Sequence, residues 1–228
     1  MLVLAFAGSI AAAQDAEGDF KPIFNGKDLK GWDGDAKFWS VKEGVLIGRS
    51  TAENPCKRNT FLIFRGGEVT DFELRLSFRI TSGNSGVQIR SRDHGEWKVT
   101  GMQADMEAGE NWTGGLYEEG GRGIMTRRGQ RVRIDAKKNK TVEKIGDSDE
   151  LLKKAPKGEW NEYTIVARGN TTTLKINGVL MSELIDNPER KVPTGLIALQ
   201  LHSGPPMKVE YKNIRLRRLS PEKKGDKD

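Results

Sequence analysis

The clearest pattern along the chain is a strict alternation of apolar and polar residues over positions 72–80. The apolar members are Phe72, Leu74, Leu76, Phe78 and Ile80, and the residues between them are Glu73, Arg75, Ser77 and Arg79. Successive side chains on a β-strand point to opposite faces, so the segment predicts a strand with one buried and one solvated face. Helical spacing of three or four residues is absent there.

Shorter patterns of the same kind continue along most of the chain. Residues 38–42 and 45–47 flank Glu43-Gly44 and predict a hairpin, and Asn177-Gly178 predicts a tight turn between two apolar runs. Further strands are expected at 60–64, 85–91, 99–107, 160–168, 171–177, 179–184, 195–202 and 208–218. The segment 127–158 is charged and poor in aromatic residues. We expect it to be a long excursion across the sheet, with a short helix at 150–154.

Ten or more strands with one weak helix predict an all-β fold of two stacked antiparallel sheets, a sandwich of the jelly-roll type. No repeat with a period of 20–50 residues recurs, and no Pro/Ser linker interrupts the strands. Residues 20–219 are therefore interpreted as a single β-sandwich domain, followed by a charged tail at 220–228.

The beginning of the chain has the character of a targeting segment. Residues 1–13 contain an apolar run and end in Ala11-Ala12-Ala13, as secretory signal peptides do, although no basic residue precedes Lys21. The run is too short to span a membrane as a helix. We therefore expect a signal peptide at 1–13, a polar leader at 14–19, and a periplasmic or secreted protein without a membrane span.

Charge and cysteine content narrow the possible partners. The chain has 38 basic and 32 acidic residues, a formal net charge of +6, and no motif that would indicate a nucleic-acid partner. Cys56 is the single cysteine, which excludes an intrachain disulfide and a cysteine-based zinc site. His94 and His202 are too few for a histidine-rich metal centre, and no cofactor is implied. Residues 147–149 (Asp-Ser-Asp) offer too few ligands for a typical calcium site, so a solvated loop is favoured, and bound calcium is left open.

Polar residues typical of sugar-binding surfaces gather in the middle of the chain. On the expected strands 85–91 and 99–107, one face carries Gln88, Arg90, Gln103, Asp105 and Glu107. A glycine-rich loop then contributes Trp112, Tyr117, Glu118, Glu119 and Arg122. The plainer interpretation is the wet face of an antiparallel sheet. The connection is longer than the two to five residues of a hairpin turn, which favours a site.

Several phrases, in order along the chain, carry a resemblance to a known family. They are Phe24-Asn25-Gly26, Gly31-Trp32, Asn84-Ser85-Gly86-Val87, Gly101-Met102-Gln103-Ala104-Asp105, Thr113-Gly114-Gly115-Leu116-Tyr117-Glu118, Gly158-Glu159-Trp160-Asn161, Ile176-Asn177-Gly178, Gly195-Leu196-Ile197-Ala198-Leu199-Gln200 and Asn213-Ile214. Over about residues 20–218 the chain resembles the 3-keto-disaccharide hydrolase family. The resemblance implies a concanavalin- or laminin-G-like β-sandwich with a carbohydrate site on its concave face. Some members cleave glycosides whose sugar has been oxidised to a ketone at C3.

A 3-keto sugar defines which groups such a site needs. The ketone acidifies the C2 proton, so one general base can remove it and expel the C1 substituent by β-elimination, after which water adds. Asp105 or Glu107 is the expected base, Arg90 the group that stabilises enolate charge, and His202 the acid for the leaving group. The remaining substrate contacts are expected from Gln88, Gln103, Trp112, Tyr117, Glu118, Arg122 and Gln200, with the two aromatic rings stacking on sugar. A purely structural role for His202 and for the two rings is left open.

An ordinary retaining glycosidase is disfavoured. The segment 103–107 is similar to the Glu-x-Asp-x-Glu strand of sandwich-fold retaining glycosidases, but Gln103 cannot act as a carboxylate nucleophile. We therefore expect an exported hydrolase or lyase acting on 3-keto-glycosides or 3-keto-disaccharides. The alternatives are a non-catalytic carbohydrate-binding module and a cell-surface interaction domain. The sequence does not define the aglycone, the glycosidic linkage or the oligomeric state.

Overall fold

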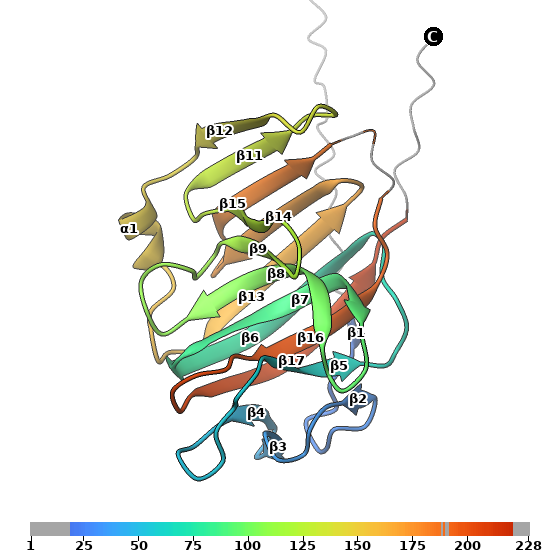
Figure 1. Cartoon of the computed structure of the whole chain (residues 1–228), viewed down its shortest axis with the longest axis vertical. Coiled ribbons are helices and arrows are strands. Elements are labelled where there is room, and N and C mark those ends of the chain that lie inside the picture. The colour runs from blue at the N-terminus through green and yellow to red at the C-terminus, as the bar shows by residue number, and fades with distance from the viewer. Residues whose placement is uncertain (1–18, 188, 190–191, 221–228) are drawn as a thin grey trace, which may run out of the picture.

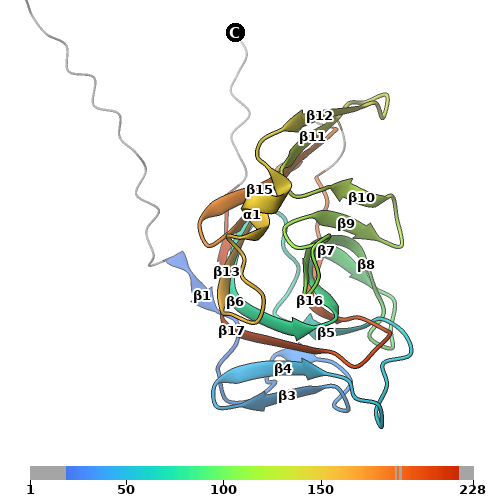
Figure 2. The same cartoon turned by 90° about the vertical axis from the view of Figure 1, so that its left-hand side faces the viewer.

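The computed structural model describes residues 19–187, 189 and 192–220, which form two facing β-sheets (Figures 1 and 2). The expected signal peptide, and most of the expected leader and tail, lie outside the described residues. Within the described part, the larger sheet has ten strands: β12 (Lys140–Lys144), β11 (Gln130–Ile134), β15 (Val179–Asp186), β14 (Thr171–Ile176), β13 (Asn161–Arg168), β6 (Phe72–Ser82), β17 (Lys208–Arg218), β4 (Val45–Arg49) and β3 (Trp39–Lys42) in that order, with β1 (Lys21–Pro22) beside β17.

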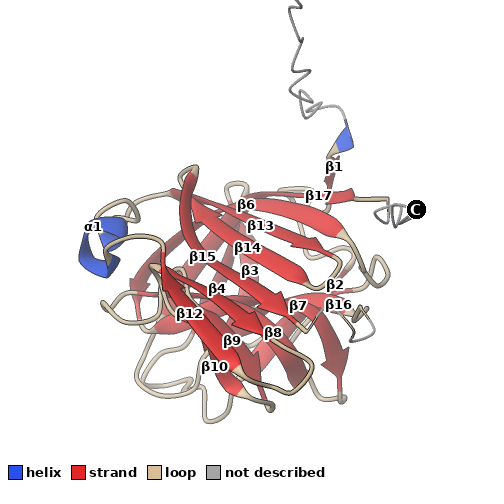
Figure 3. Cartoon of the chain, turned by 90° about the horizontal axis from the view of Figure 1, so that it is seen from above, coloured by secondary structure: helices blue, strands red, loops and turns tan. Residues whose placement is uncertain are grey.

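The smaller sheet carries the polar strands that the sequence singled out. Its seven strands among the described residues follow the order β10 (Gly123–Thr126), β9 (Leu116–Glu119), β8 (Val99–Glu107), β7 (Asn84–Asp93), β16 (Leu196–Leu201), β5 (Thr60–Phe64) and β2 (Trp32–Asp33). A short helix, α1 (Ser148–Leu152), lies at one end of the two layers (Figure 3). The expected all-β jelly-roll sandwich is confirmed.

The core lies between the sheets and is built by alternation along the strands. All five apolar residues of the 72–80 pattern on β6 are buried in one cluster with the inward residues of the facing sheet, such as Val87, Ala104 and Met106. Burial of such side chains, at roughly 25 cal/mol per Å² of apolar surface, is the main stabilising contribution. Because alternate residues of β7 and β8 face this core, their partners face outward, and this outward face holds the site described below.

Both predicted turns are present. β3 and β4 pair around Glu43 and Gly44, whose φ angles are 51° and 80°. β14 and β15 pair around Asn177 and Gly178, whose φ angles are 50° and 78°. Two consecutive positive φ angles are what a type I′ hairpin turn requires, and Asn-Gly adopts them at low cost.

Residues 127–158 differ from the expected excursion across the sheet. They contain β11 and β12, which form a hairpin, and β11 also pairs in parallel with β15. The cause is a short period-two pattern hidden among charges: Val132 and Ile134 are buried, while Arg131 and Arg133 alternate with them. The other strand of the hairpin, β12, is exposed along its whole length and forms the border of the larger sheet.

Helix α1 begins two residues earlier than expected because Asp147 caps it. The Asp147 carboxylate accepts hydrogen bonds from the backbone N–H groups of Asp149 and Glu150, which lie in the first turn of the helix. Side-chain acceptors at this position satisfy backbone donors that the helix itself cannot pair. The acidic segment 147–149 therefore serves helix formation in this structure.

The outer face of β6 is less solvated than the sequence indicated. Glu73 was expected to be exposed, but its carboxylate is buried and pairs with Arg75 at 2.7 Å and with Arg217 at 2.5 Å. The ring of Phe20 lies 4.5 Å from the Arg75 guanidinium and 4.9 Å from that of Arg217. A cation is attracted to the electron-rich face of an aromatic ring, so the Phe20 ring packs favourably over this ion-pair network.

Candidate functional site

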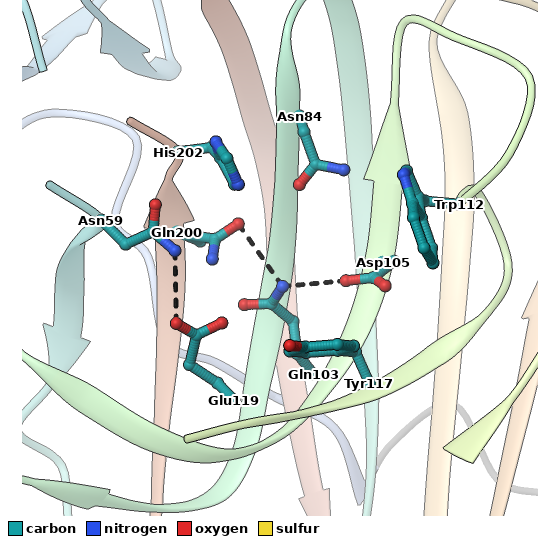
Figure 4. A pocket seen from close by; sticks show the side chains of 9 residues that line it. All are labelled: Asn59, Asn84, Gln103, Asp105, Trp112, Tyr117, Glu119, Gln200 and His202. Atoms are coloured by element: carbon teal, nitrogen blue, oxygen red, sulfur yellow. Dashed lines mark hydrogen bonds between the residues drawn. The ribbon is translucent and has the colours of Figure 1, made fainter. Parts of the chain in front are cut away.

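A hollow of about 350 Å³ opens on the outer face of the smaller sheet. The residues that line it come from four strands and three loops, and Figure 4 shows their side chains converging on one space: Asn59, Asn84, Gln103, Asp105, Trp112, Tyr117, Glu119, Gln200 and His202. We call this hollow the site pocket. It contains two carboxylates, four amides, a histidine and two aromatic rings, which is a lining suited to a polar ring-shaped ligand.

Asp105 is the buried carboxylate of the site pocket. It lies in β8, is 5% exposed, and its Oδ1 accepts a 2.8 Å hydrogen bond from Gln103 Nε2. Burial raises the pKa of Asp105 to about 8, opposed by the Gln103 hydrogen bond and assisted by the negative charges of Glu119 and Glu107. A carboxyl group whose pKa lies near neutrality can either donate or accept a proton under ordinary conditions.

A ladder of side-chain hydrogen bonds, with two amides at its centre, crosses β7 and β8 and orients this carboxylate. Ser91 Oγ donates to Gln88 Oε1 at 2.6 Å, Gln88 Nε2 donates to Gln103 Oε1 at 3.1 Å, and Gln103 Nε2 then donates to Asp105. Gln88 is fully buried beneath the pocket and pairs with Gln103 across β7 and β8. Its role is therefore to position Gln103, and the expected direct contact of Gln88 with substrate is not supported by its place.

The absence of a side chain at Gly86 makes room for this ladder. Gly86 pairs with Asp105 across β7 and β8, and a Cβ atom at Gly86 would lie 2.4 Å from Gln103 Cγ. The Gln103 side chain therefore lies directly over Gly86. From there, Gln103 Nε2 reaches both Asp105 and, at 3.4 Å, Oε1 of Gln200 on β16. Gln200 is fully buried, and its Nε2 has no hydrogen-bond partner.

The other side of the pocket is held by Asn59, Glu119 and His202. Asn59 donates from Nδ2 to Glu119 Oε1 at 3.2 Å and accepts from the Ser203 backbone N–H at 2.9 Å. His202 Nδ1 lies 2.6 Å from the Ser203 carbonyl oxygen. A carbonyl can only accept, so Nδ1 carries the proton in this contact and Nε2 is the ring nitrogen left to exchange a proton.

Trp112 reaches the pocket from the loop between β8 and β9, and Glu107 holds that loop in place. The Glu107 carboxylate accepts hydrogen bonds from the backbone N–H groups of Asn111 and, at 2.6 Å, of Trp112. Tyr117 approaches from β9, and its ring lies beside Gln103 (Figure 4). Glu107 does not line the site pocket; it lines an adjoining hollow of about 530 Å³ that shares Asn84 and His202 with it.

Arg90 does not lie in the site pocket, contrary to the expectation. A β-bulge places Arg90 and Ser91 opposite Gly101, and Arg90 has a φ of 48°. The extra residue shifts the alternation, so the Arg90 side chain leaves the face of Gln88. Its guanidinium pairs with Asp71 at 3.0 Å and donates to the carbonyls of Thr70 and Gly169, where both members of the pair are buried.

Glu118 and Arg122 also lie away from the site pocket. The expected glycine-rich loop contains the β9–β10 hairpin, and on β9 the side chains of Tyr117 and Glu119 alternate with that of Glu118. Glu118 accepts from Arg122, whose guanidinium also binds Asp186 of β15 at 2.8 Å. These two residues connect the hairpin to the larger sheet, and the interpretation of them as substrate contacts is corrected accordingly.

Six of the nine pocket residues were expected to act on or contact substrate, and three were given no such role. The six are Gln103, Asp105, Trp112, Tyr117, Gln200 and His202, and the three are Asn59, Asn84 and Glu119. Glu119 could have been assigned to the site, since it lies two positions after Tyr117 on what is now seen to be a strand, and the two side chains therefore share a face. Asn59 lies just before β5, and nothing in the local pattern indicates that it reaches Glu119.

Comparison with protein families decides the identity of the domain. Residues 19–217 match the 3-keto-alpha-glucoside-1,2-lyase-like domain. The chain belongs to this family. Membership makes it a carbohydrate-active, glycosyl-hydrolase-like protein and confirms the resemblance drawn from the sequence phrases. Comparison with curated proteins gave no match.

Solved structures share the sandwich fold at low sequence identity. A candidate glycosyl hydrolase from Parabacteroides distasonis is 21% identical, with a TM-score of 0.58 over 88% of this chain and 94% of the other. A carbohydrate-binding module from Bacillus subtilis is 14% identical, with a TM-score of 0.54 over 82% and 95%. A β-glucanase from Bacillus licheniformis is 11% identical, with a TM-score of 0.52 over 88% and 97%.

Two further findings concern ions and membranes. Among the described residues, no group of three or more His, Cys, Asp and Glu side chains is arranged to hold a metal ion. In the same part of the chain, no helix has the length and apolar character needed to cross a membrane.

Proposed function

We propose that the chain is an exported enzyme that cleaves 3-keto-glycosides, 3-keto-disaccharides among them, by β-elimination and hydration. The observation that carries the proposal is Asp105: a buried carboxyl group with its pKa raised to about 8, in a polar pocket, held by the amide of Gln103. General bases work best when their pKa is close to the working pH. At pH 7 roughly one tenth of such a group is ionised, and that fraction is a stronger base than an ordinary aspartate.

The proposed reaction follows from the acidity of the proton at C2. Asp105 takes this proton, and the electron pair left on C2 is delocalised into the C3 ketone as an enolate. Collapse of the enolate forms a C1–C2 double bond and breaks the bond from C1 to the leaving oxygen. His202 gives a proton to that oxygen from Nε2, since Nδ1 is engaged by the Ser203 carbonyl. In the hydration, His202 Nε2 takes a proton from water as its hydroxyl adds to C1, and Asp105 returns its proton to C2, so both groups regain their starting state and the reaction needs no organic cofactor.

The remaining lining supports recognition of a sugar. Trp112 and Tyr117 present rings against which the apolar face of a pyranose can stack. Asn84 and Glu119 supply hydrogen-bonding groups for sugar hydroxyls. The adjoining hollow includes Pro205 and Met207 and begins at His202, so it offers space for the leaving group on the side where that group takes its proton.

Paired substrates test the proposal. Purified protein is incubated with a 3-keto-disaccharide and, separately, with its unoxidised parent, and the release of free 3-keto sugar is followed by NMR. We expect cleavage of the oxidised substrate alone, because only its C2 proton is acidified. Absence of turnover with the 3-keto-disaccharide, while calorimetry detects binding, would instead indicate a carbohydrate-binding module, the activity named for the Bacillus subtilis neighbour. Export is tested separately by mass spectrometry of the mature N-terminus, which we expect close to Gln14.

A further inference from the structure

The amide group of Gln200 is oriented by its neighbours. Ser91 and Gln88 fix Gln103 so that its Nε2 points along the pocket floor, toward Asp105 and Gln200. An N–H group must meet an acceptor, so the atom of Gln200 that faces Gln103 is its oxygen. The amide nitrogen of Gln200 is therefore turned the other way, and Figure 4 shows it in the space that the lining residues surround.

The same nitrogen is buried and unpartnered. Gln200 has no exposed surface, and its Nε2 makes no hydrogen bond, although this nitrogen carries two N–H groups that can donate. Buried side-chain donors are nearly always paired, so a donor without a partner that lines a pocket indicates an acceptor supplied from outside the chain. An amide of this kind is matched to a ligand oxygen with lone pairs.

We infer that Gln200 is a catalytic residue whose Nε2–H donates a hydrogen bond to the C3 oxygen of a 3-keto sugar, and so stabilises the enolate that forms there. The inference rests on the proposed function. It assigns to Gln200 the role that the sequence had given to Arg90, whose guanidinium is taken up by Asp71.

The placement of Gln200 relative to Asp105 fits this role. Both side chains offer an oxygen to the single nitrogen of Gln103, at 2.8 Å for Asp105 and 3.4 Å for Gln200, so one amide group separates them. In a 3-keto sugar, the carbon that loses its proton and the oxygen that gains charge are both bonded to C3. A base and a fixed donor that line the same pocket can therefore act on the two ends of one enolate. Donors that are already oriented need no rearrangement as charge develops.

The test isolates enolate formation from bond cleavage. The probe is 1,5-anhydro-3-keto-glucitol, a 3-keto sugar that has no leaving group at C1, incubated in D₂O while NMR follows exchange of its C2 proton. We expect the wild-type protein to catalyse exchange. Gln200→Met keeps the length of the side chain and removes the donor, and it should lower the exchange kcat by about 10²–10³-fold with KM changed far less. Gln130→Met, the same substitution at a half-buried position of β11, is the matched control and should exchange at the wild-type rate.

The outcomes separate the two hypotheses. A wild-type protein that gives no exchange contradicts the proposed function, and this inference with it. A wild-type protein that exchanges while folded Gln200→Met exchanges equally fast overturns the role of Gln200 alone. Should Gln200→Met fail to fold, Gln200→Glu replaces the donor by an acceptor of equal size, and retention of wild-type exchange in that variant would overturn the inference in the same way. A loss confined to kcat, with the pH profile set by Asp105 retained, supports it.

Discussion

The Glu107 carboxylate accepts a 2.6 Å hydrogen bond from the backbone N–H of Trp112, five residues further along the chain. The strand that carries Asp105 thus also determines where the loop bearing Trp112 stands. Asp105 and Glu107 are two residues apart and looked interchangeable as bases in the sequence. In the structure, one is buried in the pocket, and the other is occupied with backbone donors.

Substitution of Glu107 should affect ligand binding more than chemistry. Glu107→Gln keeps one acceptor and weakens the hold on the loop, so we expect affinity for a 3-keto-glycoside to fall by about 1 kcal/mol, or roughly fivefold. Calorimetry and steady-state kinetics check this, with KM rising and kcat nearly unchanged. If Glu107→Gln instead removed turnover while Asp105→Asn kept it, Glu107 would be the base.

Asp105→Asn should lower turnover by about 10²–10⁴-fold, because the amide keeps the shape of the side chain and removes the proton acceptor. Ligand binding should be largely retained. In the wild-type protein, kcat/KM should rise with pH as Asp105 ionises, through its pKa of about 8. The measurement is a pH series of initial rates for both proteins, with melting temperatures confirming the fold. A wild-type rate that falls across pH 7–9 would contradict a basic role for Asp105.

The same pKa makes stability depend on pH. Folding raises the pKa of Asp105 from 3.8 to about 8, so the folded protein holds a proton that the unfolded chain has released at intermediate pH. The stability gained from this proton is complete below about pH 4 and is lost as pH rises through about 8. Asp105→Asn avoids the loss, so its melting temperature relative to wild type should increase between pH 4 and 8. The control Asp28→Asn should show almost no trend between pH 4 and 8, because a hydrogen bond from Asn25 lowers the pKa of Asp28 below its usual value of 3.8 and this carboxylate stays ionised over that range.

Arg90 is expected to contribute to stability and not to turnover. Arg90→Ala leaves Asp71 as an uncompensated buried charge and should lower the free energy of unfolding by about 3–5 kcal/mol. Arg58→Ala breaks an exposed pair with Glu96 and should cost at most about 1 kcal/mol. Denaturant titration measures both. A folded Arg90→Ala protein with wild-type stability and a large loss of kcat would indicate that Arg90 takes part in the reaction.

Leu76 tests which face of β6 is buried. Leu76→Ala should lower the free energy of unfolding by about 2–5 kcal/mol, because it leaves a cavity between the sheets. Arg75→Ala should cost about 1 kcal/mol or less, since Arg217 still pairs with Glu73. Equal losses at the two positions would mean that both faces of the strand are packed to the same degree.

Local patterns were sufficient for much of the fold and for part of the site. The alternation on β6 and the Asn177-Gly178 turn depend on neighbours along the chain, so they could be predicted from sequence. The pocket strand with Gln103 and Asp105 followed from the same period of two.

Features that depend on partners distant in sequence were missed. The bulge at Arg90 is defined by the strand opposite it, through Gly101, and a one-residue insertion reverses every later side chain. Glu73 is buried because Arg217, on a strand 144 residues away, lies beside it. The hydrogen bond from Asn59 to Glu119 spans 60 residues. No periodicity within one segment reports such contacts.

The edge strand β12 affects whether two copies of the protein can associate edge to edge through their larger sheets. A strand at the edge of a sheet has unpaired N–H and C=O groups. A strand from another molecule can pair with these groups, and repeated pairing of this kind leads to aggregation. Along β12, Val142 is the large apolar residue left exposed, and Lys140 and Lys144 stand at the two ends of the strand. A second copy arriving edge to edge would bring its own lysines against these. Repulsion between these lysines therefore disfavours edge-to-edge pairing of two copies at β12.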